Sequence, residues 1–98
     1  MNIYPALYEN TIKHIKGVEE AAMVGIYCNS THDEKVYLAL EGSELNIQSV
    51  KKQLAHGKYS IDSEALPDQI IQMTIPRKGR QHKIDRAGII EYIKKNRL

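Results

Sequence analysis

The chain has 98 residues, of which 42% are hydrophobic and 27% charged, a composition typical of one globular domain with a single hydrophobic core. No apolar run approaches the roughly 20 residues that span a bilayer, no secretory signal opens the chain, and its single cysteine excludes an intramolecular disulfide. We therefore expect one cytoplasmic domain, residues 1–98, that binds no membrane.

Charge is unevenly distributed along the chain. Between Arg77 and Arg97 the sequence has eight basic and two acidic residues, so this segment carries +6 while the remainder carries −4. An anionic ligand is therefore expected at the C-terminal end. The absence of Phe and Trp removes the best stacking platforms for nucleic-acid bases, and we do not expect nucleic acid as the partner.

The first elements are a helix and two strands. Tyr4-Pro5 suits a helix start, the spacing of Tyr8, Ile12 and Ile15 marks one helical face, and Gly17 ends the helix. The apolar run 18–27 predicts a buried strand. After a polar turn at 29–34, residues 35–41 predict an antiparallel partner strand.

A second helix and a third strand follow. Ser43 or Asn46 can cap a helix whose apolar face is Ile47, Val50 and Leu54 and whose end is Gly57. Residues 58–68 show no period and are interpreted as a connection. Residues 69–75 are strand-like through Ile70, Ile71, Met73 and Ile75.

The last part of the chain combines a basic loop with a helix. Residues 77–82 predict a polar loop, and Asp85 can cap a helix that buries Ile89, Ile90 and Ile93. The element order predicts an α+β fold, in which a small three-stranded sheet is packed by about three helices.

Two segments resemble the superfamily of AMP-forming adenylating enzymes, which includes acyl-CoA synthetases, peptide-synthetase adenylation domains and luciferases. The first runs from Tyr4-Pro5-Ala6 to Gly17-Val18-Glu19-Glu20-Ala21-Ala22-Met23-Val24-Gly25-Ile26. The second runs from Ile75-Pro76-Arg77 to Lys83-Ile84-Asp85-Arg86 and is similar to the closing Leu-Pro-Arg-Thr…Gly-Lys-Ile-Asp-Arg pattern. The two segments frame nearly the whole chain.

The resemblance implies a C-terminal lid domain that is inactive without a large N-terminal adenylating domain, in cis or in trans. ATP and Mg²⁺ would be held mainly by that domain, together with the carboxylic acid and possibly CoA or a carrier-protein thiol. Lys83 would be the catalytic lysine of acyl-adenylate formation. Its basic neighbours would assist with phosphates or with docking, or would simply be a solvated surface; they are Arg77, Lys78, Arg80, His82 and Arg86.

Two departures from the family pattern affect the loop before Lys83. His82 stands where the family has glycine, and the loop is one residue longer than usual. Two other functions therefore stay open: a small interaction module whose basic tail binds an anionic partner such as RNA, and a regulatory remnant of the lid without catalysis. Four residues within a short stretch are capable metal ligands: Cys28, His32, Asp33 and Glu34. We nevertheless expect no metal site, because no second Cys or His cluster completes one.

Overall fold

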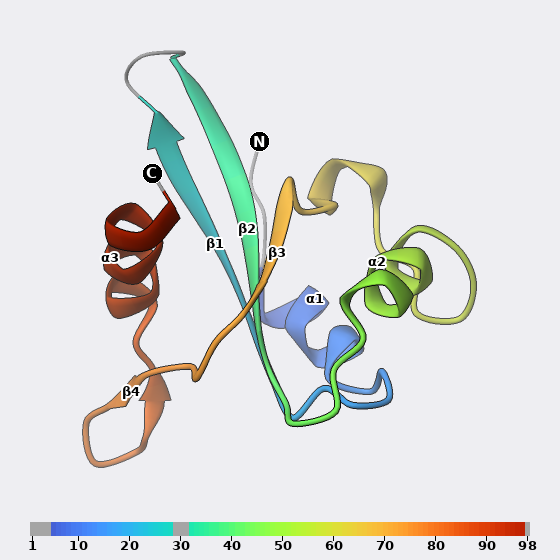
Figure 1. The fold of residues 1–98 in the computed structure, drawn as a ribbon, viewed down its shortest axis with the longest axis horizontal. Helices are drawn as coiled ribbons and strands as arrows, with labels where there is room; N and C mark the ends of the chain where they lie inside the picture. The colour runs from blue at the N-terminus through green and yellow to red at the C-terminus, as the bar shows by residue number, and fades with distance from the viewer. Residues whose placement is uncertain (1–4, 29–31, 98) are drawn as a thin grey trace.

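The computed structural model describes residues 5–28 and 32–97, which form three α-helices, one 3₁₀ helix and five strands (Figure 1). In chain order these are α1 (Pro5–Ile12), β1 (Glu20–Cys28), β2 (Asp33–Glu41), α2 (Ile47–Ala55), η1 (Ser63–Ala65), β3 (Gln69–Gln72), β4 (Arg77–Lys78), β5 (Lys83–Ile84) and α3 (Arg86–Arg97). Within these residues, every helix is too short or too polar to cross a membrane. The predicted α+β class is confirmed.

The main sheet has the order β1-β2-β3. β1 and β2 pair antiparallel from Glu20↔Glu41 to Cys28↔Asp33, as predicted, whereas β3 runs parallel to β2. β3 ends at Gln72 rather than at Ile75. The reason is a change of hydrogen-bond partner, because the N–H of Ile75 donates to the side chain of Glu41 at 2.8 Å instead of to a strand.

Helices cover both faces of this sheet, with α1 and α2 on one side and α3 on the other (Figure 1). Neighbouring residues of β1 alternate between the two cores: Met23 packs with the α1 and α2 side, and Val24 with the α3 side. Burial on both faces explains the uninterrupted apolar run in β1. In α3, Ile89 and Ile93 are fully buried and Ile90 is partly buried.

α1 is shorter than predicted, since it ends at Ile12 and not at Gly17. Beyond Ile12 the chain turns through shorter i→i+3 bonds, including Ile15 N–H to the carbonyl of Ile12 at 3.0 Å. Gly17 has φ +91°, and a Cβ there would lie 2.8 Å from the carbonyl oxygen of Glu44. The glycine therefore allows a tight packing of two turns rather than ending a helix.

The N-cap of α2 is Asn46 and not Ser43. The side chain of Asn46 accepts a hydrogen bond from the N–H of Ser49 at 3.0 Å, while the N–H of Ser43 donates to Glu19. The connection to β3 is irregular as predicted, apart from η1. Asp68 then aligns β3 with β2 through two 2.7 Å bonds to the N–H and C=O of Val36.

Candidate functional site

The prediction of a loop over residues 77–82 is wrong for its first two residues, which form the strand β4 of a small hairpin. β4 pairs antiparallel with β5 through Arg77↔Ile84 and Lys78↔Lys83. Gly79 has φ +80°, which a tight turn requires and glycine adopts without strain. The turn closes with a 3.2 Å bond from the N–H of His82 to the carbonyl of Gly79.

His82 itself has φ +53°, in the left-handed region. The family pattern has glycine at this position, and glycine adopts a left-handed backbone angle without the strain that a side chain adds. The departure noted in the sequence therefore places a strained residue directly before Lys83.

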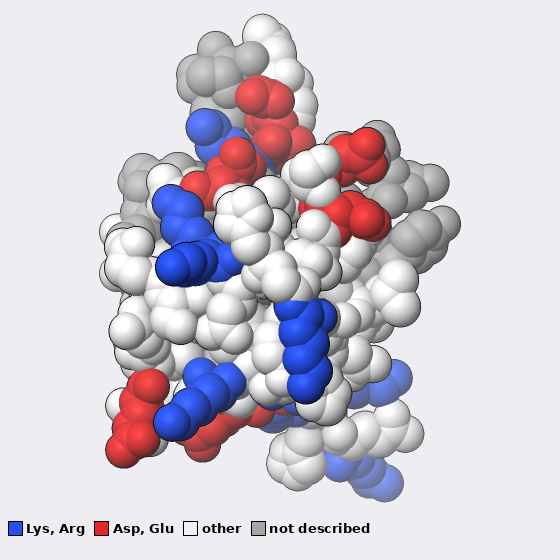
Figure 2. Space-filling view, turned by 90° about the vertical axis from the view of Figure 1, so that its right-hand side faces the viewer, with Lys and Arg blue, Asp and Glu red and all other residues white. Residues whose placement is uncertain are grey.

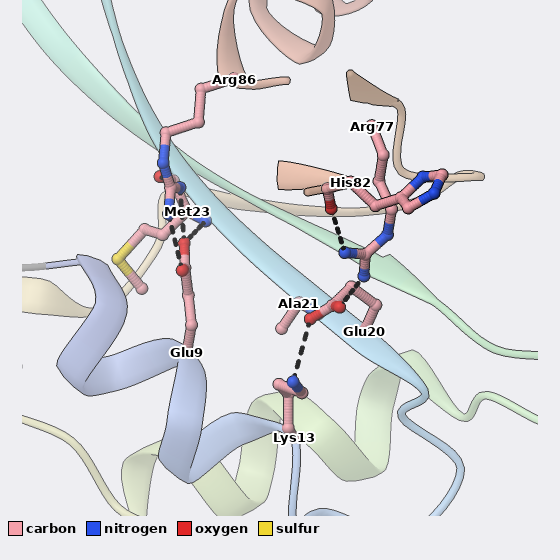
Figure 3. A network of polar contacts seen from close by, with 8 residues as sticks. All are labelled: Glu9, Lys13, Glu20, Ala21, Met23, Arg77, His82 and Arg86. Carbon is pink, nitrogen blue, oxygen red and sulfur yellow. Dashed lines mark hydrogen bonds and ion pairs between the residues drawn. The ribbon is translucent and has the colours of Figure 1, made fainter. Parts of the chain in front are cut away.

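Two of the four residues predicted to contact the nucleotide already have carboxylate partners. Arg77 forms an ion pair with Glu20 and donates to the carbonyl of His82 at 3.0 Å (Figure 3). Lys78 lies 3.5 Å from Asp85, although its side chain is 70% exposed. In this arrangement Arg77 holds the two ends of the hairpin turn together.

The other predicted site residues, Arg80, His82 and Lys83, are exposed on the hairpin. Within residues 5–28 and 32–97, the side chain of Lys83 has neither a hydrogen bond nor an ion pair. Lys83 lies at the start of β5, outside both hydrophobic cores. Its ammonium is therefore presented to solvent and not used to stabilise the fold.

Arg86 has a structural role that the sequence did not reveal. Its guanidinium donates to both carboxylate oxygens of Glu9, at 2.6 and 2.8 Å, and to the carbonyl of Met23 at 3.1 Å. Glu9 also accepts the N–H of Met23 at 2.7 Å (Figure 3). Three elements, α1, β1 and α3, thus meet at one ion pair, and Arg86 is occupied rather than available for a phosphate.

Glu9 could have been found from the helical pattern. It precedes Ile12 by three residues and therefore lies on the same face of α1 as that buried side chain. Glu9 is only 6% exposed, and a buried carboxylate requires a positive partner. The hydrogen bonds to Glu9 raise the pKa of Arg86 above its ordinary value, while burial acts in the opposite direction.

Asp85 caps α3 as predicted. Its side chain accepts a hydrogen bond from the N–H of Gly88 at 3.1 Å, and its own N–H donates to the carbonyl of Pro76 at 2.8 Å. The hydrogen bond between Asp85 and Pro76 continues the pairing of the two hairpin strands by one residue beyond Arg77 and Ile84, away from the turn. The cap therefore joins the base of the hairpin to the first turn of α3.

A groove of about 340 Å³ lies between α2 and β3. It is lined by neither Arg80 nor Lys83, and α2 and the hairpin lie at opposite sides of the molecule (Figure 1). Among the described residues, no three His, Cys, Asp or Glu side chains gather as metal ligands; His32, Asp33 and Glu34 are described, and the side chain of Cys28 is not.

No family model matches this sequence, and neither does any curated protein. Solved structures do match. ATP-bound MatB from Rhodopseudomonas palustris aligns with 20% identity and a TM-score of 0.79 over 96% of this chain and 18% of that chain. The Mycobacterium tuberculosis fatty acyl CoA synthetase aligns with 24% identity and a TM-score of 0.73 over 97% and 18%.

A four-domain nonribosomal peptide synthetase bound to AMP and glycine also aligns, with 25% identity and a TM-score of 0.75 over 89% of this chain and 6% of that chain. The present chain thus spans between 6% and 18% of the length of these three proteins. The similarity agrees with the resemblance of the two end motifs. The chain has the fold of the small C-terminal domain of the AMP-forming adenylating enzymes.

Proposed function

We propose that this domain is the lid of an ATP-dependent, AMP-forming carboxylic acid ligase, and that Lys83 supplies the cation for acyl-adenylate formation. The observation that carries the proposal is the state of Lys83: its ammonium is exposed and has no partner among the described residues. An exposed cation on an anchored hairpin is suited to act on a ligand outside its own domain.

The chemistry favours a lysine at this place. Attack of a carboxylate on the α-phosphate brings two anions together, and charge develops on the phosphate oxygens. An ammonium held near those oxygens lowers the barrier electrostatically, and it need not transfer a proton. Lys83 would position the phosphate and stabilise its charge when the lid is closed, and it would withdraw when the lid opens.

The proposal requires a large N-terminal adenylating domain, in cis or in trans. We assign ATP, Mg²⁺ and the carboxylic acid to that domain; among the described residues of this chain, no three His, Cys, Asp or Glu side chains gather where a divalent ion could bind. The acceptor of the acyl group would be CoA or a carrier-protein thiol.

The remaining basic residues differ in how easily they could assist. Arg80 and His82 are exposed in the turn beside Lys83 and could approach a phosphate directly. Arg77 would first have to release Glu20, and Lys78 would have to release Asp85. We therefore assign secondary phosphate contacts to Arg80 and His82 before the other two.

Complementation tests the function. The chain is mixed with the N-terminal adenylating domain of its own system, from which any C-terminal domain has been removed, and pyrophosphate release is measured over a panel of carboxylic acids with ATP and Mg²⁺. The parent chain should restore release. Lys83→Ala should lower the restored rate by about 10² to 10³-fold, as the loss of one group that stabilises transition-state charge does.

Lys95→Ala is the matched control, because it removes an exposed lysine from α3 and leaves the hairpin intact. It should complement like the parent. Equal complementation by Lys83→Ala and the parent would contradict the catalytic assignment and favour a regulatory remnant of the lid.

An RNA-binding function is the alternative outcome. It would show as a salt-sensitive complex with RNA and no effect on the adenylating domain. Three cations of the basic segment already have carboxylate partners within the chain, which lowers the charge available to phosphates; they are Arg77, Lys78 and Arg86. On the face that carries α2, basic side chains form separate patches between neutral and acidic ones (Figure 2).

A further inference from the structure

The ion pair of Glu9 and Arg86 occupies the free edge of the main sheet. β1 is an outer strand, and at Met23 both backbone groups are bound by this pair: the N–H by Glu9 at 2.7 Å and the carbonyl by Arg86 at 3.1 Å. The two side chains thus take the place that a neighbouring strand would occupy. We call Glu9, Arg86 and the backbone of Met23 the edge brace.

The edge brace fixes the start of α3 in three directions. Arg86 is the first residue of α3, and its guanidinium reaches two carboxylate oxygens and one carbonyl. A planar group with several donors in fixed geometry permits little rotation when it is bound in this way. α3 therefore cannot slide along β1 without breaking charge-assisted bonds at a nearly buried carboxylate.

The hairpin inherits this restraint through the residue next to Arg86. The N–H of Asp85 donates to the carbonyl of Pro76, just before β4, and Asp85 also caps α3. Packing at this junction is tight, because a Cβ on Gly88 would lie 2.7 Å from the side chain of Asp85. Lys83 precedes Arg86 by only three residues, so its direction depends on where the edge brace holds the chain.

We propose that Glu9 is a positioning residue for Lys83: through Arg86 it sets the orientation of the β4–β5 hairpin and so directs the lysine toward an external phosphate. The functional half of this inference rests on the proposed function. Glu9 itself lies in α1, away from the hairpin, and touches no ligand in this scheme.

Hydrogen exchange on the 98-residue chain alone tests whether Glu9 restrains the hairpin, and it needs no adenylating domain. In Glu9→Gln, the amide of Asp85 should exchange at least about tenfold faster relative to the amides of β2, because the hairpin loosens by local opening while the central strand stays closed. Arg86→Lys keeps the charge and loses the two-pronged geometry, and it should give an intermediate increase.

Leu54→Ala is the stability control. Leu54 is a buried residue of α2 and takes no part in the hydrogen bonds of the edge brace, so its truncation weakens the whole domain by leaving a cavity in the core. Exchange at Asp85 and in β2 should then rise together. If the exchange rates of Asp85 and of β2 also rose equally in Glu9→Gln, the inference would be overturned, since Glu9 would then contribute only to the stability of the whole domain.

The complementation assay tests the functional half. Glu9→Gln should lower kcat of adenylation about tenfold and leave KM for ATP and for the acid unchanged, whereas Leu54→Ala should leave kcat unchanged at a temperature where it is folded. A loosened hairpin with parental kcat would overturn the positioning role. Failure of the parent chain to complement would contradict the proposed function instead, and the exchange result would still decide whether Glu9 orients the hairpin.

Discussion

The base and the turn of the C-terminal hairpin have a similar supply of basic residues but use them in opposite ways. At the base, Arg86 binds a carboxylate that is nearly buried, and its neighbour Asp85 caps a helix. In the turn and at the start of β5, Arg80 and Lys83 are exposed, and no carboxylate within the described residues pairs with either. Identical residue types thus serve structure in one place and remain available for a ligand in the other.

The burial of the partner decides which use applies. A carboxylate that is 7% exposed cannot exchange its cation for water at low cost, so Arg86 stays bound. Lys78 and Asp85 also form a pair, but Lys78 is 70% exposed, and pairs of this kind contribute little. Counting basic residues in the sequence therefore overestimates the charge that a phosphate would meet.

The strongest test of this contrast is Arg86→Ala. It should lower the free energy of unfolding by about 3 kcal/mol, the low end of the range for breaking a buried pair, because the guanidinium is 39% exposed and partly screened. Chemical denaturation measures the loss. Lys83→Ala, at the turn end of the same hairpin, should change stability by less than about 0.5 kcal/mol, and equal losses would remove the distinction between base and turn.

A smaller change of opposite sign is expected at His82. Glycine at this position should relieve a left-handed backbone strain of about 1–2 kcal/mol, offset by the larger backbone entropy of glycine in the unfolded chain. His82→Gly should therefore stabilise the domain by about 0.5 kcal/mol, measured as a rise in the denaturation midpoint at constant slope. A loss of stability would mean that contacts of the imidazole stabilise the domain by more than the left-handed backbone angle of His82 costs.

The smallest effect is predicted for Lys78→Ala. Its ion pair with Asp85 is exposed, so stability should fall by no more than about 0.3 kcal/mol at low salt and by less at high salt. A double-mutant cycle with Asp85→Asn separates this pair from the helix cap, which the amide retains. If the coupling energy of Lys78 and Asp85 were as large as that of Arg86 and Glu9, the exposure of an ion pair would not determine its contribution to stability.

Much of the fold could be predicted because its determinants are local. Asn46 and Asp85 cap their helices through bonds to residues three positions ahead, so short sequence patterns suffice to place them. β1 could be predicted from a continuous apolar run, and its partner strand from the apolar residues that resume after a polar turn. Even Lys83 could be singled out, because the residues that resemble the family's closing pattern surround it.

Other features depend on residues that are far apart in the chain. The parallel pairing of β3, the early end of α1 and the short strands β4 and β5 all arise from partners that no local pattern names. The roles of the basic residues belong to the same class, since Arg86 meets a carboxylate 77 positions away. By itself, the sequence determined the order of the helices and of the main-sheet strands together with the helix caps, because neighbours along the chain control those. The resemblance to the family's closing pattern singled out Lys83 as the candidate lysine. Only the tertiary structure decided which cations are neutralised and which remain exposed, because burial and charge pairing exist only once distant segments have packed.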